Sequence, residues 1–193
     1  MKIVYLIRHG MTAGNKEKRY IGRSNEPLCR EGKLQAAALK ATGLPAFDRV
    51  FISPYIRCME TASILFPDTQ FVAVYGLREC DFGMFEGKTA AELESSAAYH
   101  AWLATGCAGP IPGGEIVEDF KARCRNAFLE AMEEVAESGS AAFVVHGGCI
   151  MAILEAYAVP KRAFYEYHLE NCEFVRCSFA NGALTIEGGS LCS

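Results

Sequence analysis

Short, continuous apolar runs recur along the chain and predict buried β-strands. They lie at 2–7, 48–52, 70–75 and 141–145. Runs of this kind, rich in β-branched residues and without strict alternation, are typical of strands that are covered on both faces. Helical periodicity fills the segments between and beside them. We expect these helices at 31–43, 54–66, 89–104 and 115–137, and the alternation with strands predicts a mostly parallel sheet.

The end of the chain has a different pattern. Segments 172–179 and 183–188 flank Asn181-Gly182, which is the strongest two-residue signal for a β-hairpin. The fold class predicted is therefore α/β: a three-layer α/β/α sandwich around a mostly parallel sheet, with a C-terminal antiparallel hairpin. No repeat or low-complexity tract interrupts the pattern, and the Gly/Pro-rich stretch 106–115 is expected to be a surface loop. A length of 193 residues suits a single domain over 1–193.

Location and redox state follow from the N-terminus and the cysteines. The first apolar run, Ile3 to Ile7, has five residues, whereas a membrane helix needs about 18 or more. Charged residues also interrupt it before any signal-peptide cleavage site, so we expect a cytoplasmic protein without a membrane partner. The nine cysteines are odd in number and contain no CxxC pair, which favours reduced thiols over a disulfide framework or a zinc site.

The charge balance limits the partners. Nineteen basic and 23 acidic residues give a net charge of −4, so the chain is not expected to bind nucleic acid through its overall field. An anionic substrate would need a local group of basic residues.

Two histidines follow predicted strands. The first strand ends in Arg8-His9-Gly10, and the strand at 141–145 ends in His146-Gly147-Gly148. Ligands of open α/β sheets bind at the edge formed by the carboxyl ends of the strands, so both histidines are candidates for one site. Gly147 and Gly148 would also begin a helix whose free N–H groups favour an anion.

An arginine and a carboxylate are expected at the same edge. Arg57 follows another strand, in the first turn of a helix, and guanidinium groups bind phosphate with fixed, multidentate geometry. Glu79 belongs to an acid- and glycine-rich loop at 77–87, where a carboxyl group can protonate a leaving oxygen. Each residue alone also fits an ordinary structural histidine, surface ion pair or turn.

Taken in order, these motifs resemble the histidine phosphatase superfamily, also called phosphoglycerate mutase-like. Arg8-His9-Gly10-Met11-Thr12 with Asn15 is similar to its R-H-G-x-T-x-x-N signature. The further matches follow the family's order along the chain. They are Gly22 to Leu28, Gly32 to Ala36, Ser53-Pro54 with Arg57 and Thr61, Glu79 to Gly87, Pro112 to Glu115, and His146 to Gly148.

The resemblance implies a role for each site residue. His9 would be the phospho-accepting nucleophile and Glu79 the proton donor. A phosphate pocket would be formed by Arg8, Asn15, Arg57, His146 and Gly147. The resemblance implies no metal and no cofactor, because surrounding cations keep an imidazole neutral and stabilise the transferring phosphoryl group. Glu86 is the rival for the acid role, although it is expected to hold the loop, and Asp81 is a third candidate.

The expected activity is hydrolysis of a small phosphate monoester through a phosphohistidine, in a chain similar to compact phosphatases such as α-ribazole phosphatase. The alternatives are a phosphoglycerate mutase, which resembles longer chains with insertions, and an inactive phospholigand-binding module. No Gly-x-Ser-x-Gly elbow, Walker loop or G-x-G-x-x-G motif supports other chemistry. The partner expected is a small phosphorylated metabolite, while the physiological substrate and the oligomeric state are not predicted.

Several positions bear on the substrate. Asn25, Ile116 and Met151 depart from the family's usual Asp, Ser and Arg. Three basic residues either contact a second anionic group of the substrate or are solvated surface charges: Arg19, Arg23 and Lys88. Four aromatic residues either line the pocket or belong to the hydrophobic core: Tyr20, Phe82, Phe85 and Trp102. For Trp102 we favour the core.

Overall fold

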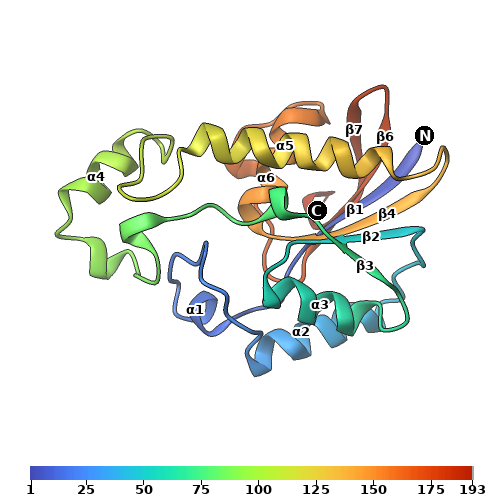
Figure 1. The fold of residues 1–193 in the computed structure, drawn as a ribbon, viewed down its shortest axis with the longest axis horizontal. Helices are drawn as coiled ribbons and strands as arrows, with labels where there is room; N and C mark the ends of the chain where they lie inside the picture. The colour runs from blue at the N-terminus through green and yellow to red at the C-terminus, as the bar shows by residue number, and fades with distance from the viewer. Residues whose placement is uncertain (193) are drawn as a thin grey trace.

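A seven-stranded sheet lies between two layers of helices in the computed structural model, which describes residues 1–192 (Figure 1). The strands are β1 (Lys2–Arg8), β2 (Arg49–Ile52), β3 (Phe71–Ala73), β4 (Ser140–Val145), β5 (Ala158–Val159), β6 (Phe174–Ala180) and β7 (Ala183–Gly189). Their order across the sheet is β3-β2-β4-β1-β6-β7-β5. The pairs β3·β2, β2·β4 and β4·β1 are parallel, and β6 is antiparallel to both β1 and β7. The predicted fold class is confirmed.

The helices divide between the two faces of the sheet. They are α1 (Ala13–Lys16), α2 (Arg30–Ala41), α3 (Ile56–Leu65), α4 (Ala97–Ala104), α5 (Val117–Glu133) and α6 (Gly147–Tyr157). In Figure 1, α2 and α3 cover one face, α5 and α6 cover the other, and α4 stands away from the sheet. Single-turn 3₁₀ helices complete the chain: η1 (Tyr75–Leu77), η2 (Gly83–Phe85), η3 (Ala91–Leu93), η4 (Phe164–Tyr167) and η5 (Ser190–Cys192).

The central strands carry consecutive apolar residues because each face packs on a different core. In β4, Phe143 and Val145 pack on the side of α5 and α6, whereas Val144 packs on the side of α2 and α3. In β1, Leu6 belongs to the first core and Ile7 to the second. Successive side chains of a strand point to opposite faces, so a sheet covered on both faces needs continuous apolar runs.

The predicted helix over 89–104 is wrong as a single element. The structure has η3 and α4 instead, separated by a turn at 94–96. Ser96 ends the connection because its hydroxyl accepts a hydrogen bond of 3.3 Å from the backbone nitrogen of Tyr99 and so caps a new helix. Serine favours such a capping position over a helix interior.

The C-terminal hairpin is confirmed. Asn181 and Gly182 have φ angles of 53° and 74°, the positive values that a two-residue type I′ turn requires. The hairpin strands β6 and β7 extend the sheet beyond β1. The short strand β5, which pairs in parallel with β7, was not predicted because two residues carry no periodic signal.

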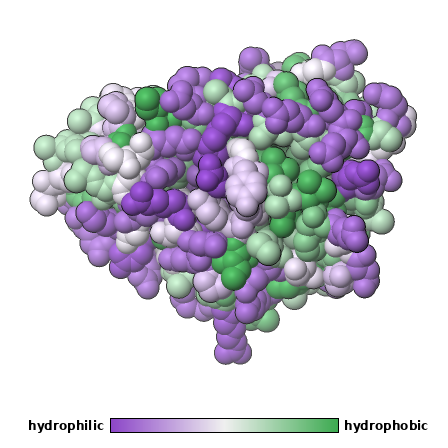
Figure 2. Space-filling view, in the orientation of Figure 1, coloured by the Kyte–Doolittle hydropathy of each residue, from purple (hydrophilic) through white to green (hydrophobic). Residues whose placement is uncertain are grey.

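The outer surface is mostly polar on the face drawn in Figure 2, where hydrophobic residues form only limited patches. Within the described residues, no helix combines the length and the hydrophobicity that a bilayer crossing needs. The thiols of seven cysteines are free: Cys29, Cys58, Cys80, Cys107, Cys124, Cys149 and Cys172. The side chain of Cys192 lies outside the described part.

Candidate active site

The parallel pairing of β1 with β4 brings His9 and His146 to the same edge of the sheet. Arg8 is in register with Val145, and the backbone nitrogen of His9 donates to the carbonyl of Val145 at 2.9 Å. Both histidines follow directly on these paired ends. Their ring centroids lie 5.1 Å apart, with the rings inclined at 67°.

His9 has one ring nitrogen engaged and the other free. Nδ1 lies 2.7 Å from the carbonyl oxygen of Gly10. A carbonyl oxygen only accepts hydrogen bonds, so the neutral ring carries its proton on Nδ1 and its lone pair on Nε2. Burial, together with the nearby charges of Arg57 and Arg8, holds the pKa of His9 well below its usual value. The ring is therefore neutral at physiological pH, with the tautomer that a nitrogen nucleophile needs.

Arg57 and His146 lie behind His9 and form a buried chain of hydrogen bonds. Arg57 Nε donates to His146 Nδ1 at 3.2 Å, which leaves the ring proton on Nε2, 2.7 Å from Ser53 Oγ. The other guanidinium nitrogens donate to the carbonyls of Ser24 and Gly22 at 2.6 and 2.9 Å. Both side chains are fully buried and do not line the cavity described below. In this structure their charge and packing act on His9 from behind.

Arg8, Asn15 and Gly147 do line the cavity. Arg8 Nη1 donates to the carbonyl of Leu169 at 2.5 Å, and its buried Nε has no hydrogen-bond partner among the described residues. Asn15 closes a capping box with Thr12, its side chain accepting from the Thr12 backbone and its own N–H donating to the Thr12 hydroxyl. The positive charge of Arg8 in the cavity lining is suited to an anionic ligand.

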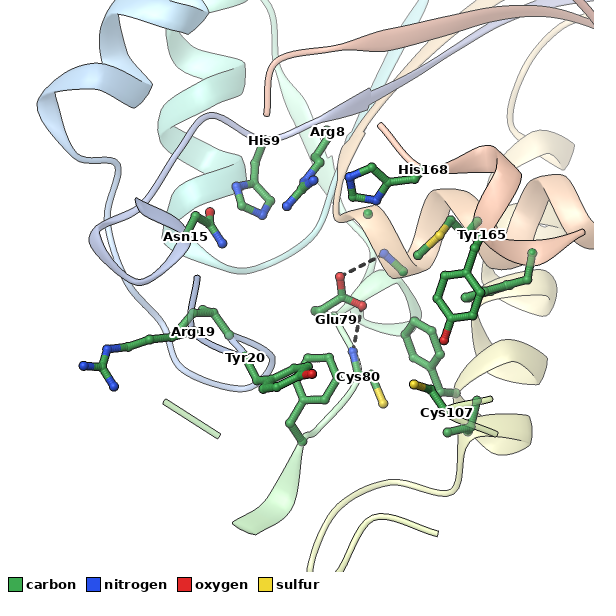
Figure 3. A pocket seen from close by; sticks show the side chains of 18 of the residues that line it. Arg8, His9, Asn15, Arg19, Tyr20, Glu79, Cys80, Cys107, Tyr165 and His168 are labelled. Carbon is green, nitrogen blue, oxygen red and sulfur yellow. Dashed lines mark hydrogen bonds between the residues drawn. The ribbon is translucent and has the colours of Figure 1, made fainter. Parts of the chain in front are cut away.

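Glu79 faces the same cavity (Figure 3). Its Oε1 accepts from the backbone nitrogen of Cys80 at 2.9 Å, and Oε2 accepts from that of Gly148 at 3.0 Å. Burial raises the pKa of Glu79, although these two hydrogen bonds and the charges of Arg57 and Arg8 oppose the shift. A carboxyl group with a raised pKa can hold the proton that a general acid must deliver.

The two rival acids have other partners. Glu86 Oε1 accepts from the backbone nitrogens of Gly22 and Ser24, at 2.8 and 3.0 Å. Asp81 accepts from Gly83 at 2.8 Å and pairs with Arg23 at 3.3 Å. Neither residue lines the cavity that His9 and Glu79 share. Glu86 thus ties two loops together, as the sequence led us to expect.

The cavity has a volume of about 370 Å³, within the usual range for small-molecule sites. Tyr20, Phe82 and Trp102 form part of its wall, whereas Phe85 is buried outside it. Trp102 also belongs to the apolar core, as predicted. The sequence motifs gave no sign of Cys107, Phe120, Phe164, Tyr165 and His168, which line the cavity from segments outside every motif.

The three departures from the family pattern occupy different environments. Asn25 Oδ1 accepts from the backbone nitrogen of Ile56 at 2.7 Å and so satisfies the first turn of α3. Ile116 is 59% exposed and precedes α5 without a side-chain cap. Met151 lines the cavity. Only Met151 is placed to contact a ligand directly.

The described part of the chain contains no group of side chains suited to a metal ion. Within residues 1–192, no three His, Cys, Asp or Glu side chains come close enough together to hold an ion. The positive charges at the site belong to Arg8 and Arg57.

Comparison with known proteins identifies the family. Residues 4–189 match the model of the histidine phosphatase superfamily (branch 1), so the chain belongs to this superfamily. A curated relative from Escherichia coli O1:K1 / APEC, named probable phosphoglycerate mutase GpmB, is 30% identical over 185 residues, covering 91% of this chain and 84% of the relative.

Solved structures with the same fold include two phosphatases. The α-ribazole phosphatase from Shigella flexneri has a TM-score of 0.84 at 23% identity, over 96% of this chain and 94% of that one. A phosphoserine phosphatase mutant from Entamoeba histolytica, in complex with phosphoserine, has a TM-score of 0.84 at 23% identity, over 99% and 98% of the two chains.

Proposed function

We propose that the protein hydrolyses phosphate monoesters in two steps without a metal ion. In the first step, the Nε2 lone pair of His9 attacks phosphorus, the bond to the ester oxygen breaks, and Glu79 gives its proton to the leaving alkoxide. In the second step, the Glu79 carboxylate takes a proton from water, whose oxygen attacks the phosphohistidine. The P–N bond then breaks, its electron pair returns to Nε2, and phosphate is released.

The observation that carries this proposal is the contact between His9 Nδ1 and the carbonyl oxygen of Gly10, which determines the tautomer of His9. A hydrogen bond of 2.7 Å to the carbonyl of Gly10 fixes the proton on Nδ1 and leaves Nε2 as the only ring nitrogen with a lone pair. Membership of the superfamily supports the same role. The raised pKa of Glu79, which burial causes, supports that residue as the acid.

Arg8 and Arg57 supply the positive field that a metal would otherwise provide. We expect turnover of p-nitrophenyl phosphate to be unchanged after exhaustive treatment with EDTA. Loss of activity that a divalent ion restores would contradict the metal-independent mechanism.

The direct test compares two histidine variants. His9→Ala should abolish turnover of p-nitrophenyl phosphate and the acid-labile phosphoenzyme that rapid quenching traps in the wild type. The control is His100→Ala, which removes an exposed imidazole bonded to the carbonyl of Glu94 and should leave both signals intact. A phosphoenzyme that persists in His9→Ala would remove His9 from the nucleophilic role.

A phosphoglycerate mutase is the second candidate, because the 30% identical relative carries that name. The enzyme should be mixed with 3-phosphoglycerate, with and without a trace of the 2,3-bisphosphate. We expect phosphate release from simple monoesters and no rapid formation of 2-phosphoglycerate. Rapid interconversion with little free phosphate from any ester would favour the mutase.

A further inference from the structure

The cavity has two chemically different ends. Arg8, His9 and Asn15 supply charge and hydrogen-bonding groups at one end, while rings from five separate segments form much of the remaining wall. These rings belong to Tyr20, Phe82, Trp102, Phe120, Phe164 and Tyr165. Figure 3 shows Tyr20 and Tyr165 on the far side of Glu79 from His9.

The polar atoms of this wall are engaged with protein or buried. The hydroxyl of Tyr20 bonds that of Tyr99 at 2.8 Å, and the hydroxyl of Tyr165 donates to the carbonyl of Gly106 at 3.4 Å. Trp102 Nε1 is buried and has no hydrogen-bond partner among the described residues. The wall therefore presents mainly ring surface to a ligand, which favours apolar and aromatic groups.

Arg19, the second arginine in the cavity lining, is already paired with carboxylates. Arg19 lines the cavity through its stem, but its guanidinium pairs with Glu17 and Glu92 at 2.7 Å each and donates to the carbonyl of Gly87 at 2.6 Å. In Figure 3 this guanidinium points away from Glu79 and His9. A second anionic group on a substrate, such as a carboxylate, would have to compete with two glutamates for Arg19.

We propose that the substrate is a phosphate monoester of an apolar, ring-bearing alcohol. This inference rests on the proposed phosphatase activity and specifies its leaving group. The phosphoryl group would lie at the end formed by Arg8 and His9, and the ring would pack against Phe164 and Tyr165. Apolar surface removed from water supplies the affinity.

Three esters test this specificity: ethyl phosphate, 2-phenylethyl phosphate and 3-phosphoglycerate. All three have an alkoxide leaving group, so Glu79 must protonate the same kind of group in each. We expect kcat/KM for 2-phenylethyl phosphate to exceed that for ethyl phosphate by at least about tenfold. We expect 3-phosphoglycerate to be no better than ethyl phosphate. Equal values for the two uncharged alcohols, or a preference for the sugar acid, would overturn the inference while leaving hydrolysis itself established.

A pair of exposed tyrosines provides the matched variants. Tyr165→Ala removes a ring at the cavity, and Tyr75→Ala removes a ring from a separate groove beside α5. The two tyrosines are similarly exposed, with Tyr165 at 56% and Tyr75 at 69%. The preference for 2-phenylethyl over ethyl phosphate should fall about threefold or more in Tyr165→Ala and stay constant in Tyr75→Ala. Absence of turnover with all esters, p-nitrophenyl phosphate included, would contradict the proposed function itself.

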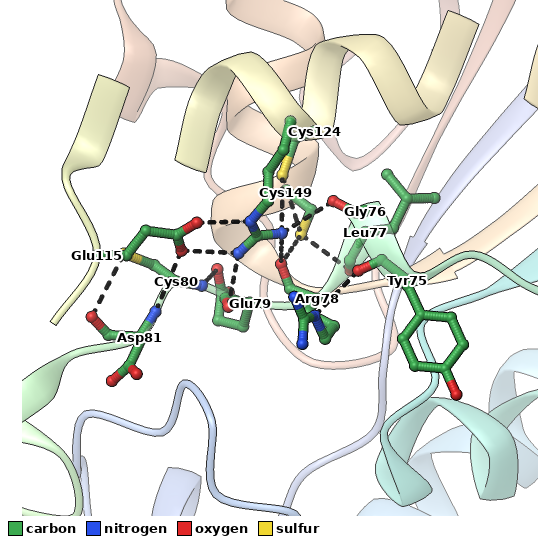
Figure 4. A network of polar contacts seen from close by, with 11 residues as sticks. Tyr75, Gly76, Leu77, Arg78, Glu79, Cys80, Asp81, Glu115, Cys124 and Cys149 are labelled. Atoms are coloured by element: carbon green, nitrogen blue, oxygen red, sulfur yellow. Dashed lines mark hydrogen bonds and ion pairs between the residues drawn. The ribbon is translucent and has the colours of Figure 1, made fainter. Parts of the chain in front are cut away.

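A second, independent observation concerns the loop that carries Glu79. Arg123, on α5, binds this loop through backbone carbonyls. Figure 4 shows the loop from Tyr75 to Asp81 with Glu115 and Cys124 beside it. Nη1 donates to the carbonyls of Gly76 and Arg78 at 2.8 and 2.6 Å, and Nη2 donates to that of Glu79 at 3.0 Å. One guanidinium thus satisfies three carbonyls within four residues of chain.

Glu115 binds both Arg123 and the backbone of the loop beyond Glu79. Its two carboxylate oxygens accept from Arg123 Nε and Nη2 at 2.6 and 2.8 Å, a bidentate pair with both side chains about one-fifth exposed. The backbone nitrogen of Glu115 donates to the carbonyl of Asp81 at 2.9 Å. Arg123 and Glu115 therefore hold the backbone on both sides of the Glu79 carboxyl.

We infer that Arg123 is a positioning residue for the proposed acid, acting through the backbone of residues 76–79 without touching substrate. Lysine cannot reproduce the planar fork of a guanidinium. Arg123→Lys should therefore let the Glu79 carboxyl move, which slows protonation of a poor leaving group more than transfer from a good one.

The measurement is the ratio of kcat for ethyl phosphate to kcat for p-nitrophenyl phosphate. We expect this ratio to fall about tenfold in Arg123→Lys, with KM nearly constant. The control is Arg125→Lys on the same helix, where the arginine pairs with Glu118 at 2.9 Å on the surface; its ratio should not change. A merely structural role for Arg123 would lower both rates equally, through a smaller folded fraction, and would overturn the inference.

Discussion

The carboxylate of Glu79 and the backbone nitrogen of Gly148 are joined by a hydrogen bond of 3.0 Å. This bond links the loop after η1 to the first turn of α6, the helix that follows His146. The sequence predicts free N–H groups at Gly147 and Gly148 that favour an anion. The Gly148 N–H instead donates to the Glu79 carboxyl group of the protein itself, at the first turn of the helix.

Gly148→Ala should disturb this contact. A Cβ at position 148 would meet Glu79 Oε1 and come within 3.1 Å of Phe120. We expect kcat for ethyl phosphate to fall about tenfold or more, because small displacements of a catalytic group are costly. Gly147→Ala provides the comparison, since a Cβ there stays 3.6 Å from the guanidinium of Arg8, and its effect should be smaller. Equal losses would contradict a specific clash with Glu79.

The pH dependence should reveal the raised pKa of Glu79. The acid works only when protonated, so hydrolysis of ethyl phosphate should decline as the pH rises through this pKa, which burial places above its ordinary value of 4.5. Hydrolysis of p-nitrophenyl phosphate needs little proton transfer and should lack this decline. Both esters require neutral His9, so this requirement cancels in the ratio of their kcat/KM values. After correction for the phosphate ionisation of each ester, the pH dependence of the ratio reports the ionisation of Glu79. A pH-independent ratio in the wild type would contradict the assignment.

Glu79→Gln and Glu86→Gln should separate the two carboxylates. Removing the acid should slow phosphoenzyme formation from ethyl phosphate by about 10² or more, with a much smaller effect for p-nitrophenyl phosphate. Glu86→Gln should instead lower the free energy of unfolding by about 1–2 kcal/mol. Its amide oxygen accepts from Gly22 and Ser24 without the charge of a carboxylate, and its amide nitrogen cannot accept the hydrogen bond from the backbone nitrogen of Phe82. Stopped-flow kinetics and urea unfolding measure the two effects. If Glu86→Gln shows the stronger dependence on the leaving group, the roles are reversed.

Arg57 should matter for stability as well as catalysis. Arg57→Met leaves the carbonyls of Gly22 and Ser24 and the ring of His146 without their donor. We expect the free energy of unfolding to fall by about 3 kcal/mol, as for other truncations of buried charged networks. Arg49→Met is the control, because Arg49 is exposed and its side chain bonds only the adjacent Asp48 carbonyl; a change below about 0.5 kcal/mol is expected there. Similar losses in both variants would contradict the importance of the buried chain.

Much of the fold was predictable because its signals are local. The runs at 2–7 and 141–145 are continuous for the physical reason that both faces of β1 and β4 are buried. The Asn181-Gly182 turn depends on the φ angles of two residues alone. The helix predicted over 89–104 failed because one serine cap outweighed a weak periodicity.

The sequence by itself determined the family, the alternation of strands and helices, and which residues follow the strands at the reactive edge. Tertiary structure alone decided what surrounds those residues. It placed Arg57 and His146 behind His9 rather than at the cavity surface, and it turned the guanidinium of Arg19 towards two glutamates. It also brought Phe164 and Tyr165 from a segment without any motif to the cavity wall. Hydrogen-bond direction and burial depend on contacts between residues far apart in the chain, and no local pattern encodes them.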